Sequence, residues 1–172
     1  MLDVESSDAR QKTIGLFQFV VFVVTGIACL RWIHRASSNA HVLAGRALQF
    51  TPGWAVGWYF IPVLCLWKPF QAMSEIAQVS ASAARRPLPD LGPWWTFWLI
   101  GNLSGSLAFN LQREAQEIST LMWGSAAWIA SDLASLVADL CLIGIVKAIS
   151  SMQLQGYDTR RMAPATGAAQ PA

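Results

Sequence analysis

Two aspartates inside an apolar stretch are the residues of this sequence best suited to chemistry. Asp132 and Asp139 lie seven residues apart with Ser135 between them, so on a helix the three side chains share one face. A carboxylate at the middle of a bilayer costs about 2.5–3.5 kcal/mol, so such residues usually face a bundle interior and are often functional. The trio predicts an ion or proton site. The alternative is that the acids form structural bridges to Arg31 or Lys147, or lie nearer the ends of their segment.

Tryptophans form the second candidate site. The chain has nine Trp and two Tyr, and several Trp flank apolar runs, where an indole keeps its ring in lipid and its N–H near the headgroups. One interpretation is anchoring at the interface; the other is contact with a lipid or a membrane partner. The residues considered for these contacts, with the one carboxylate that a lipid enzyme would use as a base, are Trp54, Trp58, Trp67, Trp94, Trp95 and Glu75.

No catalytic, metal or cofactor site is predicted. The sequence contains no GxSxG, HExxH or Walker-type loop. Cys29, Cys65 and Cys141 lie in apolar runs without CxxC spacing, which is typical of small buried hydrophobic residues. His34 and His41 have no third ligand nearby. A net charge of +2 without a basic stripe argues against nucleic acid as a partner.

Composition indicates which elements must position these residues. The chain is 54% hydrophobic and 13% charged, against about 25% charged in soluble domains. Four apolar segments, residues 13–30, 52–70, 94–111 and 118–149, are numbered one to four in chain order. The fold class predicted is all-α, an integral membrane helical bundle.

Segment two differs from the others because it contains Pro62 and Pro69, which cannot donate backbone hydrogen bonds. We expect it to be kinked, broken or re-entrant in the bilayer. The stretch 71–83 that follows predicts an amphipathic helix lying on the membrane surface. Its apolar face comprises Ala72, Ile76, Val79 and Ala83.

The domain organisation follows from the same pattern. Residues 1–12 are a polar N-terminal segment, 13–152 are the transmembrane domain, and 153–172 are a flexible C-terminal tail rich in Ala, Pro, Gly and Gln. The first helix is expected to continue past segment one and to end at a glycine C-cap, Gly45.

Small residues predict how segments three and four pack. A short linker makes the two segments antiparallel, and glycines four residues apart let helices approach closely. The residues predicted to meet are Gly101, Ser104, Gly105 and Ala108 on one segment and Ser131 and Ser135 on the other.

The numbers of Lys and Arg on each side of the membrane distinguish two topologies. Four crossings put eight on one side and four on the other, with both termini in the cytoplasm and Asp132 near Arg31. If segment two only dips into the bilayer, the split is nine to three, the N-terminus lies outside, and Asp139 is near Arg31. We expect four crossings, because residues 47–67 are uncharged and long enough to span.

Four motifs occur in a fixed order along the chain. They are W-x-x-R-x-x-x-N-A from Trp32 to Ala40, TPGWAVGWYFIP from Thr51 to Pro62, LWKPFQAMSE from Leu66 to Glu75, and the pair Trp94-Trp95. This order resembles the bacterial membrane proteins of domain-of-unknown-function family 4328, over roughly residues 17–153. The resemblance implies a multi-spanning helical architecture and no established activity.

The function predicted is that of a non-enzymatic structural or interaction module in the bacterial cytoplasmic membrane, with several passes through it. Its expected partner is membrane lipid, another membrane protein or a second copy of the chain. The alternatives are a small transport or channel component that uses the acidic site and, with less support, a membrane enzyme acting on lipid.

Overall fold

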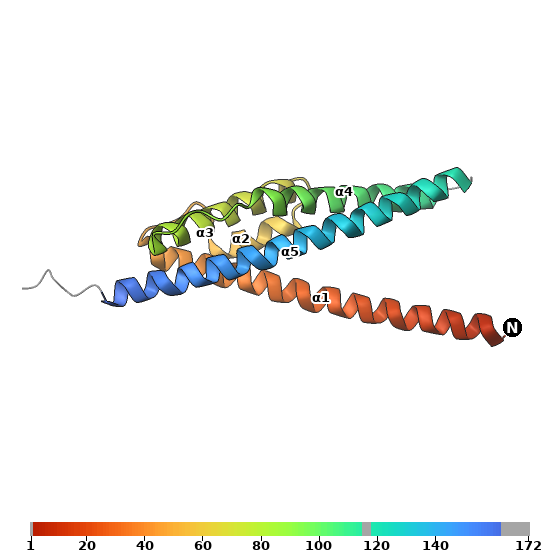
Figure 1. Cartoon of the computed structure of the whole chain (residues 1–172), viewed down its shortest axis with the longest axis horizontal. Helices are drawn as coiled ribbons and strands as arrows, with labels where there is room; N and C mark the ends of the chain where they lie inside the picture. Colours follow the sequence, from red (N-terminus) through yellow and green to blue (C-terminus); the bar gives the residue numbers. More distant parts are fainter. Residues whose placement is uncertain (1, 115–117, 163–172) are drawn as a thin grey trace, which may run out of the picture.

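Two long helices run the length of the molecule. The computed structural model describes residues 2–114 and 118–162. Helices α1 (Leu2–Ala44) and α5 (Ile118–Met162) contain 43 and 45 residues. At about 1.5 Å per residue each is roughly 65 Å long, which is more than twice the ~30 Å hydrocarbon core of a bilayer. The helices lie together near their C-terminal ends and diverge toward their N-terminal ends (Figure 1).

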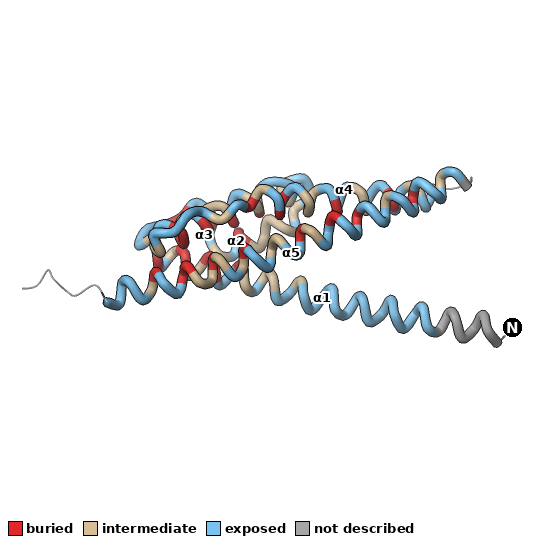
Figure 2. Tube along the Cα trace, in the orientation of Figure 1, coloured by how far each residue is buried: buried red, intermediate tan, exposed pale blue. Residues whose placement is uncertain are grey.

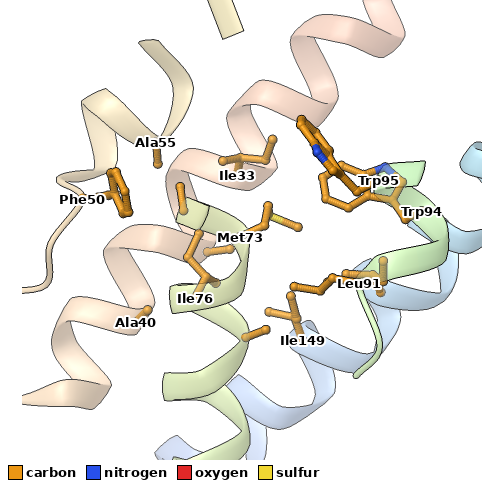
Figure 3. Packing of buried hydrophobic residues seen from close by; sticks show 14 of the residues in the cluster. Ile33, Ala40, Phe50, Ala55, Met73, Ile76, Leu91, Trp94, Trp95 and Ile149 are labelled. Carbon is orange, nitrogen blue, oxygen red and sulfur yellow. The ribbon is translucent and has the colours of Figure 1, made fainter. Parts of the chain in front are cut away.

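The region where α1 and α5 meet is here called the body, residues 31–98 and 142–162. Short helices and the start of α4 complete it, and buried residues concentrate there (Figure 2). Its core takes apolar side chains from all five α-helices, and Figure 3 shows them converging. Those that are at most 1% exposed are Ala40, Ala55, Ala72, Met73, Ala77 and Ile149.

Two arms extend from the body and diverge from each other (Figure 1). The α1 arm is residues 10–30. The hairpin arm is residues 99–114 and 118–141, in which α4 (Gly92–Glu114) runs antiparallel to α5. The described chain is helical throughout its regular elements, so the all-α prediction is confirmed.

Segment two is broken. It contains α2 (Pro52–Gly57) and two short 3-10 helices, Trp58–Phe60 and Leu64–Leu66. Pro62 cannot continue the backbone hydrogen bonds, and Val63 adopts a φ of 69°. None of these helices alone is long enough to cross a bilayer, so the expected crossing by segment two is not confirmed.

Helix α3 (Lys68–Ala84) is amphipathic as predicted, but it is a core helix of the body. Its buried face contacts α1 and α5, which turns the expected membrane-surface helix into an internal packing element. The predicted members Val79 and Ala83 lie at the edge of this face and are only half-buried. The buried face is Pro69, Ala72, Met73, Ile76, Ala77, Ser80 and Ala81.

The helix ends differ in part from the expected boundaries. Gly45, with a φ of 65°, follows the last residue of α1, so the predicted glycine C-cap is confirmed. The polar N-terminal segment is continuous with α1, which begins at Leu2. Likewise α5 continues past residue 152 to Met162, so that part of the expected tail is helical. Residues 163–172 lie outside the described residues.

The close pairing of α4 and α5 is confirmed. A Cβ placed on Gly101 would lie 2.8 Å from Ser135 Oγ, and one on Gly105 would lie 3.0 Å from Ser131 Oγ. Ser131 Oγ donates a 2.8 Å hydrogen bond to the Gly101 carbonyl, and Ala108 is fully buried. The glycines therefore admit the serine side chains between the two backbones.

Two of the described helices are long and apolar enough to cross a membrane. They are α1 from Arg10 onward and α5 from Ser119 onward. By length and composition these two segments are weak evidence for a membrane protein. Helix α4, which carries Asn102, Ser106 and Asn110 along its length, does not meet the same criterion.

Candidate functional site

A buried glutamine joins three elements of the body. Gln153 Nε2 donates to the Ala36 carbonyl at 2.9 Å and to Ser80 Oγ at 3.2 Å, while its Oε1 accepts from Asn39 Nδ2 at 3.0 Å. Ser80 Oγ in turn donates to the Ile76 carbonyl at 2.7 Å. Both polar atoms of the Gln153 side chain, Nε2 and Oε1, thus hold α1, α3 and α5 together. This cluster is therefore structural.

The C-terminal end of α1 is capped from α5. Arg160 donates to the Val42 carbonyl at 2.8 Å and to the Leu43 carbonyl. A cation beside the last carbonyls also compensates the negative end of the helix dipole. Further along, Trp32 Nε1 donates to Ser150 Oγ at 3.2 Å. These contacts and those of Gln153 fix α1 to α5 side by side and parallel.

Glu75 holds the loop between α1 and α2. Its carboxylate oxygens accept from the Gln49 amide at 2.7 Å and the Phe50 amide at 3.1 Å. Both oxygens bind backbone, which accounts for a carboxylate on a half-buried face of α3. The residue is therefore a positioning group of the fold, and neither the lipid contact nor the catalytic base considered from the sequence is needed to explain it.

The tryptophans divide into buried and exposed groups. Trp94 and Trp95 are 3% and 8% exposed, and Trp95 stacks on Trp98 with ring centroids 4.6 Å apart. These rings contact the protein core. Trp54 and Trp67 are 51% and 41% exposed, so lipid or partner contact stays a prediction for them.

Trp58 lies between these groups. Its ring is 4.6 Å from that of Trp54, and Lys68 Nζ lies 5.8 Å from the Trp58 centroid and 5.4 Å from that of Phe50. Lys68 Nζ also donates to Gln71 Oε1 at 3.2 Å. These cation–π contacts explain why a lysine sits inside an aromatic motif.

The acidic trio lies on the hairpin arm. Asp132, Ser135 and Asp139 are all exposed. Among the described side chains neither aspartate forms an ion pair, so the predicted pairing with Arg31 is wrong for both acids. The part of the chain that the structure describes also has no group of three His, Cys, Asp or Glu side chains that could hold a metal ion.

A polar hollow of about 270 Å³ lies beside the trio, along one side of the seam between α4 and α5. It is lined by Gly101, Asn102, Gly105, Ser131 and Ser135. The other side of the seam has a hollow of about 570 Å³ with mostly apolar lining, including residues such as Leu107, Leu111 and Trp123. The hairpin arm therefore has one polar side and one apolar side.

The α1 arm has a polar stripe that the sequence reading missed. Gln18, Thr25 and Cys29 precede Trp32 and Ala36 at steps of seven, four, three and four residues, so all five share one helix face. Trp32 and the Ala36 carbonyl are the groups that bind α5. The stripe therefore continues the face of α1 that meets α5 in the body, and its steps of three, four and seven residues were the signal that could have revealed it.

The two arms come closest where they leave the body (Figure 1). Cys29 lies within electrostatic reach of Asp139 on α5 and of Tyr59 in segment two. The Tyr59 hydroxyl is buried and has no hydrogen-bond partner among the described residues. Burial raises the pKa of the Tyr59 phenol above its ordinary value, and the nearby Cys29 adds to the rise.

Comparisons with known proteins establish the family and nothing beyond it. No curated protein and no solved structure gave a significant match. A family model matches residues 1–151, which include α1 to α4, the buried tryptophans and the acidic trio. The chain therefore belongs to the family described as Domain of unknown function (DUF4328).

Proposed function

We propose that the protein is a multi-pass protein of the bacterial cytoplasmic membrane that works as a structural or interaction module and not as an enzyme. The observation that carries the proposal is the exposure of the α1 arm. Ile14, Phe17 and Phe22 are 52%, 69% and 75% exposed. In water such a surface would cost about 25 cal/mol for each Å². In lipid it costs nothing, so the arm belongs in a bilayer.

The proposed topology has three crossings. The α1 arm crosses once and the hairpin arm crosses twice, with the body on one side. Nine of the twelve Lys and Arg residues then lie on the body side, and Arg10, Lys12 and Arg113 lie on the other. By the positive-inside rule the body faces the cytoplasm and the N-terminus lies outside.

Segment two supplies the lipid contacts in this arrangement. It lies where the body meets the arms, and its exposed side chains are aromatic or aliphatic: Trp54, Phe60, Val63, Leu66 and Trp67. Indoles favour the headgroup region of a bilayer. We infer that segment two seats the body on the membrane surface without crossing it.

A second function, transport, draws support from the acids of the hairpin arm, Asp132 and Asp139, which are both exposed. Exposed acids such as Asp132 and Asp139 facing water inside a bilayer would suit a cation path. The lipid-enzyme alternative has the least support, because both oxygens of Glu75 bind backbone amides.

Cysteine labelling tests the topology. In a variant without Cys29, Cys65 and Cys141, single cysteines are placed at Ser7, Arg113, Arg86 and Thr159 and treated with a membrane-impermeant maleimide on intact cells. Ser7→Cys and Arg113→Cys should label from outside, and Arg86→Cys and Thr159→Cys only after lysis. Labelling of Ser7→Cys and Thr159→Cys from the same side would contradict three crossings. Recovery of the protein in the soluble fraction would contradict the membrane proposal itself.

A further inference from the structure

A hollow of about 280 Å³ lies between α1 and α5 in the body and is here called the Arg35 hollow. The motif W-x-x-R-x-x-x-N-A lines it from α1, because its Trp, Arg and Asn lie three and four residues apart on one helix face. Residues of α5 at the same kind of spacing form the other wall. The polar lining residues are Trp32, Arg35, Asn39, Ser150, Gln153 and Tyr157.

Three of these side chains have hydrogen-bond donors to spare. Neither the Arg35 guanidinium nor the Tyr157 hydroxyl forms a hydrogen bond or ion pair within the part of the chain that the structure describes. The Ser150 hydroxyl accepts from Trp32 Nε1 but donates to no described group. Among the described residues that line the hollow there is no carboxylate. A full positive charge and two hydroxyls without an acid suit an anion.

The surroundings of the hollow are also basic. Arg31 precedes Arg35 by four residues and Lys147 precedes Ser150 by three, so each lies on the same helix face as its neighbour, one turn nearer the arms. Both cations are exposed. The stretches of α1 and α5 in the body, residues 31–44 and 142–162, contain five Lys and Arg residues and one acid, Asp158. The positive charge near Arg35 is therefore not balanced within these two helices.

The depth of the hollow narrows the choice of anion. Arg31 is the first charge after the uncharged stretch of the α1 arm, and Arg35 lies four residues further on, or about 6 Å. The headgroup layer of a bilayer extends about 5–7 Å beyond its hydrocarbon core. In the proposed topology the Arg35 guanidinium is therefore level with the phosphates of the surrounding lipid.

We propose that the Arg35 hollow binds a phosphate group, with Arg35 as its charge partner. The guanidinium presents parallel N–H donors that match two phosphate oxygens, and the hydroxyls of Ser150 and Tyr157 add neutral donors. A hollow of this size suits a headgroup better than a whole lipid. An anionic phospholipid is the expected source, and this part of the inference rests on the proposed function. A soluble phosphate compound has the same chemistry and is the other source.

The test compares two arginines in the full chain purified in dodecyl maltoside, with phosphatidylglycerol titrated and bound lipid counted by native mass spectrometry. Arg35→Gln should raise the dissociation constant for phosphatidylglycerol about tenfold, because a charge-assisted contact is lost. Arg86→Gln removes the same charge from an exposed residue that lines no described hollow, and it should bind like the wild type. Diacylglycerol, which lacks the phosphate, should bind equally to all three proteins.

The Arg35 side chain has no hydrogen bond or ion pair in the described chain, so Arg35→Gln should keep the melting temperature of the wild type. Equal loss of phosphatidylglycerol in Arg35→Gln and Arg86→Gln overturns the inference, as does equal binding by all three proteins.

Glycerol phosphate distinguishes the two sources. If millimolar glycerol phosphate leaves phosphatidylglycerol bound, the hollow takes a lipid; if it displaces the lipid from the wild type, the hollow takes the soluble compound. If impermeant labelling confirms three crossings while Arg35→Gln and Arg86→Gln bind alike, only this inference fails. If the protein is recovered in the soluble fraction, the proposed function fails, and glycerol phosphate binding that depends on Arg35 still supports the phosphate site.

Discussion

The two halves of α1 contrast most clearly within this molecule. From Arg31 to Ala44 the helix is rich in polar and small residues, and Ile33, Ala36 and Ala40 of this half are buried. From Thr13 to Leu30 it carries no charge and is far more apolar, yet most of its side chains are exposed. The more apolar half is thus the less buried half.

In the proposed function, this inversion reflects a different solvent for each half, water for the body and lipid for the α1 arm. In water, burial of apolar surface drives folding, so the most apolar stretch should lie in the core. In lipid that drive is absent, and helices associate through small residues and hydrogen bonds. The body follows the first rule and the seam of the hairpin arm follows the second.

The largest effect is expected from comparing matched substitutions in the two halves of α1. Ile33 is 5% exposed and Ile27 is 54% exposed on the same helix. Ile33→Ala should lower the free energy of unfolding in detergent by about 2–5 kcal/mol, because it leaves a cavity in the body. Ile27→Ala is the matched control and should change it by less than about 0.5 kcal/mol. Equal losses would mean that the α1 arm packs against protein.

The next effect concerns the polar centre of the body. Gln153→Leu leaves the Ala36 carbonyl and Asn39 Nδ2 without their partners, at about 1–3 kcal/mol for each buried group left unsatisfied. Gln155→Leu, an exposed glutamine on the same helix, is the control. Chemical denaturation in detergent measures both. An unchanged midpoint for Gln153→Leu would show that the network adds no stability.

A smaller loss is expected in the hairpin arm. Gly105→Leu forces a side chain onto Ser131, so it should cost about 1–3 kcal/mol and separate α4 from α5. Gly144→Leu provides the control, because a Cβ at Gly144 meets nothing within 4 Å. Thermal melting in detergent compares the two variants. The prediction fails if Gly105→Leu has the same melting temperature as the wild type.

The sequence allowed the helices and the small-residue seam to be predicted, because both depend on local spacing. Glycines at residues 101 and 105 and serines at 131 and 135 were sufficient to pair α4 with α5. The break in segment two followed from Pro62. Local spacing does not determine whether segment two is broken or spans a bilayer. That choice depends on the contacts of α3 with α1 and α5 in the body.

The candidate site was predicted less completely. Asp132, Ser135 and Asp139 were recognised as one face, but their expected partner, Arg31, forms no ion pair with them among the described residues. Long-range contacts of Gln153 and Arg160 decide how α1 meets α5, and these join residues more than a hundred positions apart. Such pairings have no signal in a single sequence.

The smallest effect lies at the junction of the body and the arms. Burial raises the pKa of Tyr59, so the folded protein keeps this phenol protonated at pH values where the unfolded chain, with a pKa of about 10, loses the proton. The unfolded state then binds fewer protons, and stability falls as the pH rises through about 10. Tyr59→Phe removes this loss, so its melting temperature should decline less than that of the wild type between pH 9 and pH 11. Tyr157→Phe, which keeps Tyr59, is the control and should follow the wild type. Parallel curves for Tyr59→Phe and the wild type would mean that water reaches the hydroxyl, and the junction would then belong to the arms and not to the body.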